Sequence, residues 1–172
     1  MHPPILNLDQ VELESLPEAL APTGETAGRY QQRFARVGQQ LGAQKLGYRL
    51  YVLEPGMRGS PFHSHRVNEE MFYIVAGEGH IRLGRERFSI RAGDVIACPS
   101  GDQEAAHQII NTSAGELRYL AVSTQQSPEI CEYPDSGKYA VMDNFKIDAD
   151  GNATGFAAIA RPADGIDYWD GE

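Results

Sequence analysis

Residues 61–79 read PFHSHRVNEEMFYIVAGEG, a stretch that combines closely spaced metal-ligand residue types with a strand pattern. His63 and His65 are separated by a single residue, so on an extended segment both rings point to the same face. Alternation along the run that follows places Glu70 on the same face as Phe72 and Ile74. The stretch therefore predicts two histidines and one carboxylate inside a β-structure.

The opposite face of this strand is also apolar, because it carries Met71, Tyr73 and Val75. A strand with two apolar faces is covered on both sides, as in a barrel or a double-layered sheet. Glu70 is then a buried carboxylate, which is costly unless it is paired or bound to a cation. Glu69 is the competing carboxylate, but its parity directs it outward if Glu70 points inward. The pattern favours a cation opposite Glu70.

A third histidine enters an apolar strand further along the chain. Residues 107–111 read HQIIN, so His107 shares a face with Ile109 and Asn111. Alone, such a histidine is typical of a core, but here it completes a set of three imidazoles and one carboxylate. The set suits Fe(II), Mn(II), Ni(II), Cu(II) or Zn(II) and has too many nitrogens for Mg²⁺ or Ca²⁺. The candidate metal ligands are His63, His65, Glu70 and His107.

Short runs of β-forming residues, separated by Gly and Pro turns, fill the centre of the chain. The predicted strands are Lys45–Leu53, Met71–Ala76, His80–Leu83, Arg87–Ile90, Asp94–Ala97, His107–Asn111 and Leu117–Ser123. We expect no helix of normal length between them. This spacing is typical of an all-β sandwich or barrel.

Length, charge and cysteine content narrow the functional classes. The 172 residues suffice for one domain with its own core. A formal charge of −9 disfavours nucleic acid and anionic membranes as partners and leaves small molecules or other proteins. The chain shows neither a basic, apolar leader nor an apolar run of about 18 residues, so we expect a cytoplasmic protein. Cys98 and Cys131 form no CxxC pair and are interpreted as small hydrophobes.

The chain divides into three segments. Residues 1–30 contain four prolines and are expected to form an irregular arm with a short helical piece around Glu12–Leu20. Residues 31–126 would form the barrel, and residues 127–172 an irregular C-terminal segment packed on it, with a turn at Tyr133–Lys138.

A homodimer is expected for two reasons. An arm of this kind often packs across a dimer. The outward apolar face of Met71, Tyr73 and Val75 also needs cover, which a partner barrel provides.

The motif spacing resembles the two signature motifs of the cupin superfamily, over about residues 45–123. The matching positions are Gly56, His63, His65, Glu70 and Gly77 for the first motif, and Gly93, Pro99, Gly101, His107 and Asn111 for the second. The resemblance implies a double-stranded β-helix, the cupin jelly-roll barrel, with one metal held by three histidines and one glutamate. The chain is similar to a bacterial single-domain group whose members mostly lack an assigned reaction. Its loop Asp102–Ala106 is longer than usual, and we expect it at the mouth of the barrel.

Three functions are compatible with such a site. The first is Lewis-acid isomerisation of a small oxygen-rich molecule, such as a sugar or sugar phosphate, at Zn, Mn, Fe or Ni. The second is Fe-dependent dioxygenase chemistry. The third is a non-catalytic module that binds or stores a small ligand.

Several other residues have a possible role in a pocket. The candidates for contacting an anionic substrate, each equally well explained as barrel wall or surface, are Arg49, Tyr51, Arg58, Phe72 and Tyr119. His80 is expected at an exposed or edge position rather than as a fifth ligand. No side chain stands out as a catalytic acid or base.

Overall fold

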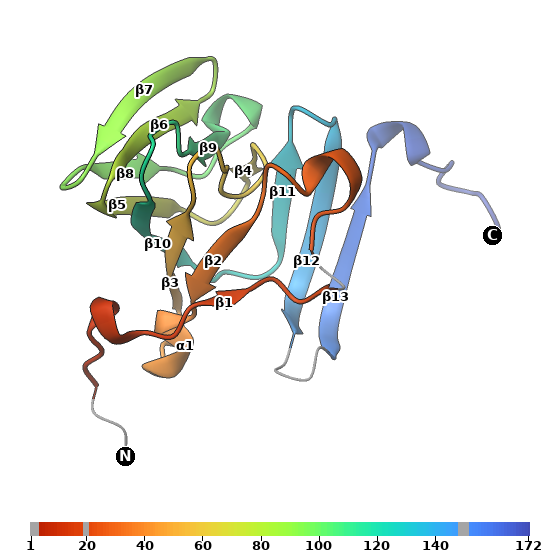
Figure 1. Cartoon of the computed structure of the whole chain (residues 1–172). Coiled ribbons are helices and arrows are strands. Elements are labelled where there is room, and N and C mark those ends of the chain that lie inside the picture. Colours follow the sequence, from red (N-terminus) through yellow and green to blue (C-terminus); the bar gives the residue numbers. More distant parts are fainter. Residues whose placement is uncertain (1–3, 19–20, 148–151) are drawn as a thin grey trace.

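The computed structural model describes residues 4–18, 21–147 and 152–172, which form an almost entirely β-structured protein (Figure 1). The α-helix in these ranges is the short α1, Val37–Gln40. Further helical turns are the 3-10 segments η1 (Leu8–Gln10), η3 (Gly24–Thr26), η4 (Gln103–Ala105) and η5 (Pro162–Asp164). Among these residues, no helix is long and apolar enough to cross a membrane.

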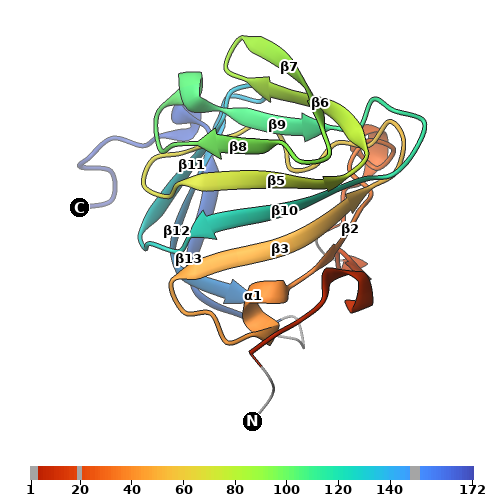
Figure 2. The same cartoon turned by 90° about the vertical axis from the view of Figure 1, so that its left-hand side faces the viewer.

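One layer of the fold is a six-stranded antiparallel sheet with the order β1-β2-β3-β10-β5-β8. Its strands are β1 (Glu14–Ser15), β2 (Gln32–Ala35), β3 (Leu46–Leu53), β10 (Leu117–Thr124), β5 (Glu70–Ala76) and β8 (Val95–Cys98). Figure 2 shows β3, β10, β5 and β8 lying side by side across this layer. The register places Ala121 of β10 between Arg49 of β3 and Phe72 of β5.

The second layer combines two smaller sheets. The first has the order β7 (Glu86–Arg91), β6 (Glu78–Leu83), β9 (His107–Ile110), and the second the order β13 (Ala153–Ala160), β12 (Lys138–Ile147), β11 (Glu129–Tyr133), β4 (Ser64–His65). An isolated bridge between His63 and His107, with backbone hydrogen bonds of 2.8 and 3.2 Å, joins β9 to the segment before β4. The two sheets thus continue into one another.

The hydrophobic core lies between the two layers. Its buried members from both are Leu53, Phe72, Ile74, Ile81, Ile90, Cys98, Ile109, Leu117 and Tyr119. Burial of each large aliphatic side chain contributes about 1.5–3 kcal/mol. The turn from β5 to β6 requires glycine, because Gly77 has a φ of +83° and a Cβ there would lie 2.2 Å from the Glu116 carbonyl oxygen.

The seven strands predicted from the sequence are all present, with ends shifted by at most two residues. The all-β, double-stranded β-helix prediction is confirmed. The prediction of an irregular tail is wrong, because residues after Ser127 form β11, β12 and β13. β13 is rich in alanine, a weak β-former, and its strand conformation follows from pairing with β12.

The N-terminal arm packs on its own barrel. Its partly buried leucines and valine contact an outer cluster of Ala35, Val37 and Leu50; they are Leu6, Leu8, Val11 and Leu13. The prediction of a helix around Glu12–Leu20 is wrong in the described part, since Glu14–Ser15 forms β1 and pairs with β2. Residues 19–20 lie outside the described residues. Pairing with β2 outweighs the weak local helix preference.

Candidate metal centre

The four predicted ligand residues come from both layers of the barrel. His63 and His65 flank the buried Ser64, so their rings share the interior face while Ser64 points away. The backbone bridge between His63 and His107 brings the third ring beside the first. Glu70 begins β5 in the six-stranded sheet and faces the three rings across the interior.

The donor atoms converge on one point. The Glu70 Oε2 atom lies 2.8 Å from Nε2 of His107, 3.6 Å from Nε2 of His65 and 3.8 Å from Nε2 of His63. All four donor atoms lie within 4.8 Å of one another. Four ligands at about 2.1 Å from one ion are separated by up to about 4.2 Å, so small side-chain movements would complete a coordination shell.

The second ring nitrogen of each histidine, Nδ1, has a contact on the side of the ring away from Glu70. The Nδ1 contacts are Pro61 O at 2.7 Å for His63, Cys131 Sγ at 3.3 Å for His65 and Ala105 O at 3.3 Å for His107. These contacts orient all three rings with Nε2 toward Glu70. Such outer partners are typical of metal-binding histidines, because they fix the tautomer and the ring orientation.

The residues present fit a transition metal. His65 Nε2 is buried and has no hydrogen-bond partner among the described residues, although its carboxylate neighbour is 3.6 Å away. A buried polar atom without a partner is costly, and a cation between His65 and Glu70 would satisfy it. Three imidazoles and one carboxylate suit Zn, Mn, Fe or Ni. The cluster is therefore a candidate metal site.

Electrostatics keep the cluster charged without a metal. Burial raises the pKa of Glu70, but the hydrogen bond with His107 and the nearby His65 ring outweigh it and hold that pKa well below its usual range. Burial lowers the pKa of His63 to about 4, and repulsion from His107 acts in the same direction. Burial also lowers the pKa of His65, but the contact with Cys131 and the nearby Glu70 carboxylate outweigh it and raise the value to about 10. A metal ion would therefore have to displace a proton from His65.

The competing candidates lie elsewhere. Glu69 is exposed, so the interior carboxylate is Glu70, as parity predicts. His80 lies on β6, where its ring nitrogens contact Thr112 Oγ1 at 2.7 Å and Ser89 Oγ at 3.3 Å. It is remote from the four-residue cluster and is not a fifth ligand there.

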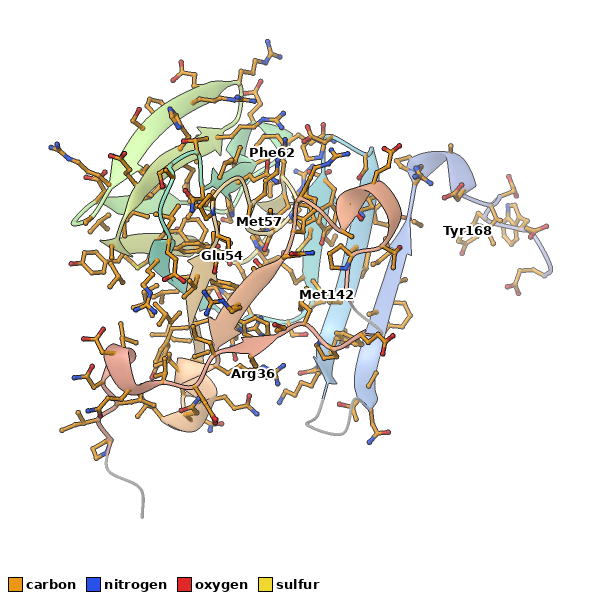
Figure 3. The ribbon with its side chains drawn as sticks, viewed as in Figure 1. Arg36, Glu54, Met57, Phe62, Met142 and Tyr168 are labelled. Atoms are coloured by element: carbon orange, nitrogen blue, oxygen red, sulfur yellow. The ribbon has the colours of Figure 1, made fainter. Side chains whose placement is uncertain are left out.

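A cavity of about 360 Å³ opens onto the cluster. Beyond the four cluster residues, its lining includes Gly47, Arg49, Tyr51, Phe72, Tyr119, Ala121, Ser123, Gln125 and Met142. Four of the five pocket candidates from the sequence line it, and Arg58 does not. The rings of Tyr51 and Tyr119 stack with centroids 5.3 Å apart and form an aromatic wall. Met142, labelled in Figure 3, reaches the cavity from β12 in the C-terminal segment.

The loop Asp102–Ala106 is not at the mouth of this cavity, which corrects the expectation from its length. None of its residues lines the cavity as described. The loop instead forms η4, and the Ala106 carbonyl oxygen accepts a hydrogen bond of 2.8 Å from the Gly84 N–H. The loop contributes to the site indirectly, because the Ala105 carbonyl oxygen contacts Nδ1 of His107.

The sequence did not identify two buried residues that lie close to Nδ1 of His65. Glu129 Oε2 lies 3.5 Å from His65 Nδ1, and Cys131 is the register partner of His65. Cys131 was interpreted as a small hydrophobe, yet its sulfur contacts the imidazole. No local signal identifies them, because the pairing of β4 with β11 joins residues more than 60 positions apart. Cys98, in contrast, lies within the hydrophobic core as expected.

Comparisons with known proteins agree with this geometry. Residues 49–123 match the cupin domain family. Cupincin from Oryza sativa subsp. japonica is 42% identical over 67 residues, which is 37% of this chain and 14% of cupincin. The oxalate-binding protein of Thermotoga maritima is 38% identical over 60 residues, which is 35% of this chain and 47% of that protein. The chain thus spans less than half the length of these curated relatives.

Two solved structures match almost the whole chain. A sugar phosphate isomerase of the cupin superfamily from Silicibacter pomeroyi is 25% identical, with a TM-score of 0.76 over 97% of this chain and 98% of that chain. A putative sugar phosphate isomerase from Acidithiobacillus ferrooxidans is 22% identical, with a TM-score of 0.75 over 95% of each chain. At its lower identity, the second shows the shared fold alone. The likeness extends beyond the cupin domain into the C-terminal strands.

Proposed function

Because this chain belongs to the cupin superfamily, we propose that His63, His65, Glu70 and His107 bind one divalent transition metal and that the protein isomerises a small, oxygen-rich substrate. Sugars and sugar phosphates are the favoured substrate class. The observation that carries the proposal is the convergence of all four donor atoms, within 4.8 Å of one another, beside an open cavity.

The bound metal would supply Lewis-acid chemistry, because a divalent cation polarises carbonyl and hydroxyl oxygens of a substrate. Glu70 would serve as a ligand rather than as a base, since its carboxylate faces all three rings. Tyr51, Phe72 and Tyr119 would exclude water from one side of the substrate. The Ser123 hydroxyl and the Gln125 amide offer hydrogen bonds to substrate hydroxyl groups.

Two observations favour isomerisation over the alternatives. The cavity combines an aromatic wall with a polar end that contains Arg49, Ser123 and Gln125, which suits a polyhydroxylated molecule. The Silicibacter pomeroyi protein, similar over nearly the whole chain, is a sugar phosphate isomerase. Fe-dependent dioxygenase chemistry remains the second candidate, because the same donor set binds Fe(II).

The test is a metal analysis followed by a deuterium-exchange assay. Protein purified without chelator should contain about one transition metal per chain, and Glu70→Gln should lose it while keeping its far-UV circular dichroism spectrum. The loaded protein should introduce deuterium from D₂O at C2 of an aldose phosphate or at C1 of the corresponding ketose phosphate. Full occupancy in the Glu70→Gln variant would contradict the ligand assignment. Binding of sugars with neither deuterium exchange nor conversion between aldose and ketose would instead indicate a storage or sensing module, and native iron with oxygen uptake would indicate a dioxygenase.

We also propose that the protein is a cytoplasmic homodimer. Tyr73 and Val95 are register partners on the outer face of β5 and β8 and are 40% and 66% exposed. The N-terminal arm does not cover them, because it packs on Ala35, Val37 and Leu50. A second copy placed on this face would bury the two side chains. Light scattering should give twice the chain mass, and Tyr73→Glu should shift it toward the monomer; a monomeric native protein would refute the dimer.

A further inference from the structure

The interior surface of β3 and β10 is aromatic at one end and carries small residues at the other. At one end, Tyr51 lies opposite Tyr119; at the other, Gly47 lies opposite Ser123. Between them, Arg49 lies opposite Ala121. Small side chains on β10 leave room beside the arginine, so the cavity extends from the metal cluster to its guanidinium group.

The guanidinium group of Arg49 has no carboxylate partner in the part of the chain that the structure describes. Its contacts are the Tyr51 hydroxyl, 3.4 Å from Nη1, and the ring of Phe34, whose centroid is 5.7 Å from Cζ. Six other arginines do form ion pairs, namely Arg29, Arg33, Arg36, Arg66, Arg82 and Arg118. In a protein with a net charge of −9, a cavity-lining arginine free of carboxylates is available to an anion.

The strand arrangement sets the distance between the two ends of the cavity. Arg49 is on β3 and Glu70 on β5, with β10 between them. Neighbouring strands are about 4.8 Å apart, so the two rows of Cα atoms are separated by about 10 Å. This span fits a chain of a few carbons with a metal-binding oxygen pair at one end and a charged group at the other.

We propose that Arg49 is an anion subsite that receives the phosphate group of a small phosphorylated polyol or aldonate whose other end faces the metal cluster. The inference rests on the proposed function, because it assumes a metal at the cluster. The planar guanidinium group matches phosphate oxygens in a bidentate manner, which a surface lysine would not reproduce. Phosphorylated substrates are then selected over free sugars of the same length.

The experiment compares D-arabinonate with 5-phospho-D-arabinonate by calorimetry on the zinc-loaded full-length protein. The phosphorylated ligand should bind at least about 10-fold more tightly, since charge-assisted hydrogen bonds are strong. Arg49→Gln should remove this preference, because it weakens binding of the phosphorylated ligand more than binding of D-arabinonate, and it should leave the affinity for zinc unchanged. Arg58→Gln removes the same charge outside the cavity and should preserve the preference.

The outcomes separate the two proposals. Equal affinity for both ligands in the native protein, or an unchanged preference in Arg49→Gln, overturns the anion subsite while leaving the metal-dependent function intact. If Arg49→Gln lowers the affinity for both ligands by a similar factor, the anion subsite is also overturned, because that pattern reflects a structural role of Arg49. If the zinc-loaded protein binds neither ligand, both the subsite and the proposed function are refuted.

An independent observation concerns the sulfur atom behind His65. The Nδ1 atoms of His63 and His107 face backbone carbonyl oxygens, whereas His65 Nδ1 faces Cys131 Sγ at 3.3 Å and, slightly farther away, Glu129 Oε2 at 3.5 Å. Both Cys131 and its neighbour Glu129 are almost fully buried. The contact joins β4 to β11 within the barrel wall, so it is shielded from water.

We infer that Cys131 is a positioning residue: its sulfur accepts a hydrogen bond from His65 Nδ1–H and thereby keeps Nε2 directed at the metal position. Loss of an outer partner of this kind typically lowers metal affinity about 10- to 100-fold.

Zinc affinity measured by competition with a chromophoric chelator tests this inference. Cys131→Ala should weaken zinc binding at least about 10-fold, whereas Cys131→Ser, which keeps an acceptor, should stay within about threefold of native protein. The Co(II)-loaded protein should show a changed visible spectrum in Cys131→Ala and a near-native one in Cys131→Ser. Native zinc affinity in Cys131→Ala, or equal losses in both variants, would overturn the positioning role.

Discussion

Removal of the Glu129 carboxylate should destabilise the protein and disturb His65 at the same time. Glu129 is 5% exposed and accepts hydrogen bonds from the backbone N–H groups of Arg66, Val67, Asn68 and Ile130, at 2.8 to 3.2 Å. The side-chain amide of Asn68 also donates to it. One buried carboxylate thus holds the segment that connects β4 to β5, and with it the residue next to His65.

The size of the destabilisation depends on which of these donors can form a hydrogen bond to water after the Glu129 carboxylate is removed. Arg66 and Val67 are exposed, so their N–H groups can be solvated after a Glu129→Ala substitution. Asn68 is 7% exposed, and its donors would lose a charged acceptor without gaining water. A hydrogen bond to a charged group contributes about 1.5–3 kcal/mol, so two such losses sum to about 3–6 kcal/mol. Removal of one partner of a buried charged group costs about 3–5 kcal/mol, which is the value expected here.

Urea denaturation of metal-free protein measures this change. Glu129→Ala should lower the free energy of unfolding by about 3–5 kcal/mol, and Glu129→Gln by less, because an amide oxygen still accepts hydrogen bonds. Glu132→Gln is the matched control, since Glu132 contacts only the Arg66 guanidinium among the described polar contacts, at 2.9 Å, and should cost under about 1 kcal/mol. Equal effects of Glu129→Ala and Glu132→Gln would refute the reasoning.

Four further outcomes are expected. His107→Ala should lower metal content to near zero while His80→Ala preserves it, as atomic absorption would show; equal contents would contradict the ligand assignment. Asn111→Ala should cost about 2–4 kcal/mol by urea denaturation, because this fully buried amide bonds two backbone carbonyls, and a loss under 1 kcal/mol would speak against it. Ala121→Phe should fill the cavity and abolish ligand binding in calorimetry without loss of zinc. The raised pKa of His65, about 10 against 6.5, means that protonation stabilises the metal-free protein fully below pH 6.5 and that this contribution is lost as the pH rises through about 10. The free energy of unfolding of the metal-free protein should be lower at pH 9.5 than at pH 7, and the zinc affinity should be higher. Equal values at the two pH values would indicate that the His65 ring is neutral throughout.

The C-terminal segment shows where sequence reasoning reached its limit. β12 and β13 lack the runs of β-branched residues that identified the central strands, and their pairing supplies the backbone hydrogen bonds that define them. Exposed apolar side chains remain there, including Phe156 and Ile159 at 56% and 69% exposure. Tyr168 extends from the tail beyond these strands (Figure 3). Contacts made outside a segment cannot be recognised from its own composition.

The pocket illustrates the same limit within the barrel. Arg49 and Arg58 were equivalent candidates in the sequence, because each lies near a predicted strand. The register of β3 with β10 turns Arg49 into the cavity, whereas Arg58 forms an isolated bridge to Ile110 at the end of β9, in another sheet. The length of the loop before His107 suggested that it lies at the mouth of the barrel, but none of its five residues lines the cavity, whereas Gly47 and Ser123 of β3 and β10 do.

The sequence by itself determined the candidate ligand set, since alternation along a strand assigns each side chain to a face. That rule placed His63 with His65 and chose Glu70 over Glu69. Only the tertiary structure decided what surrounds these residues. The pairing of β4 with β11, and of β3 with β10, puts Cys131 beside the Nδ1 atom of His65 and Arg49 on the wall of the cavity. Side-chain parity is a local property of the backbone, whereas the partners across a sheet depend on how the whole barrel packs.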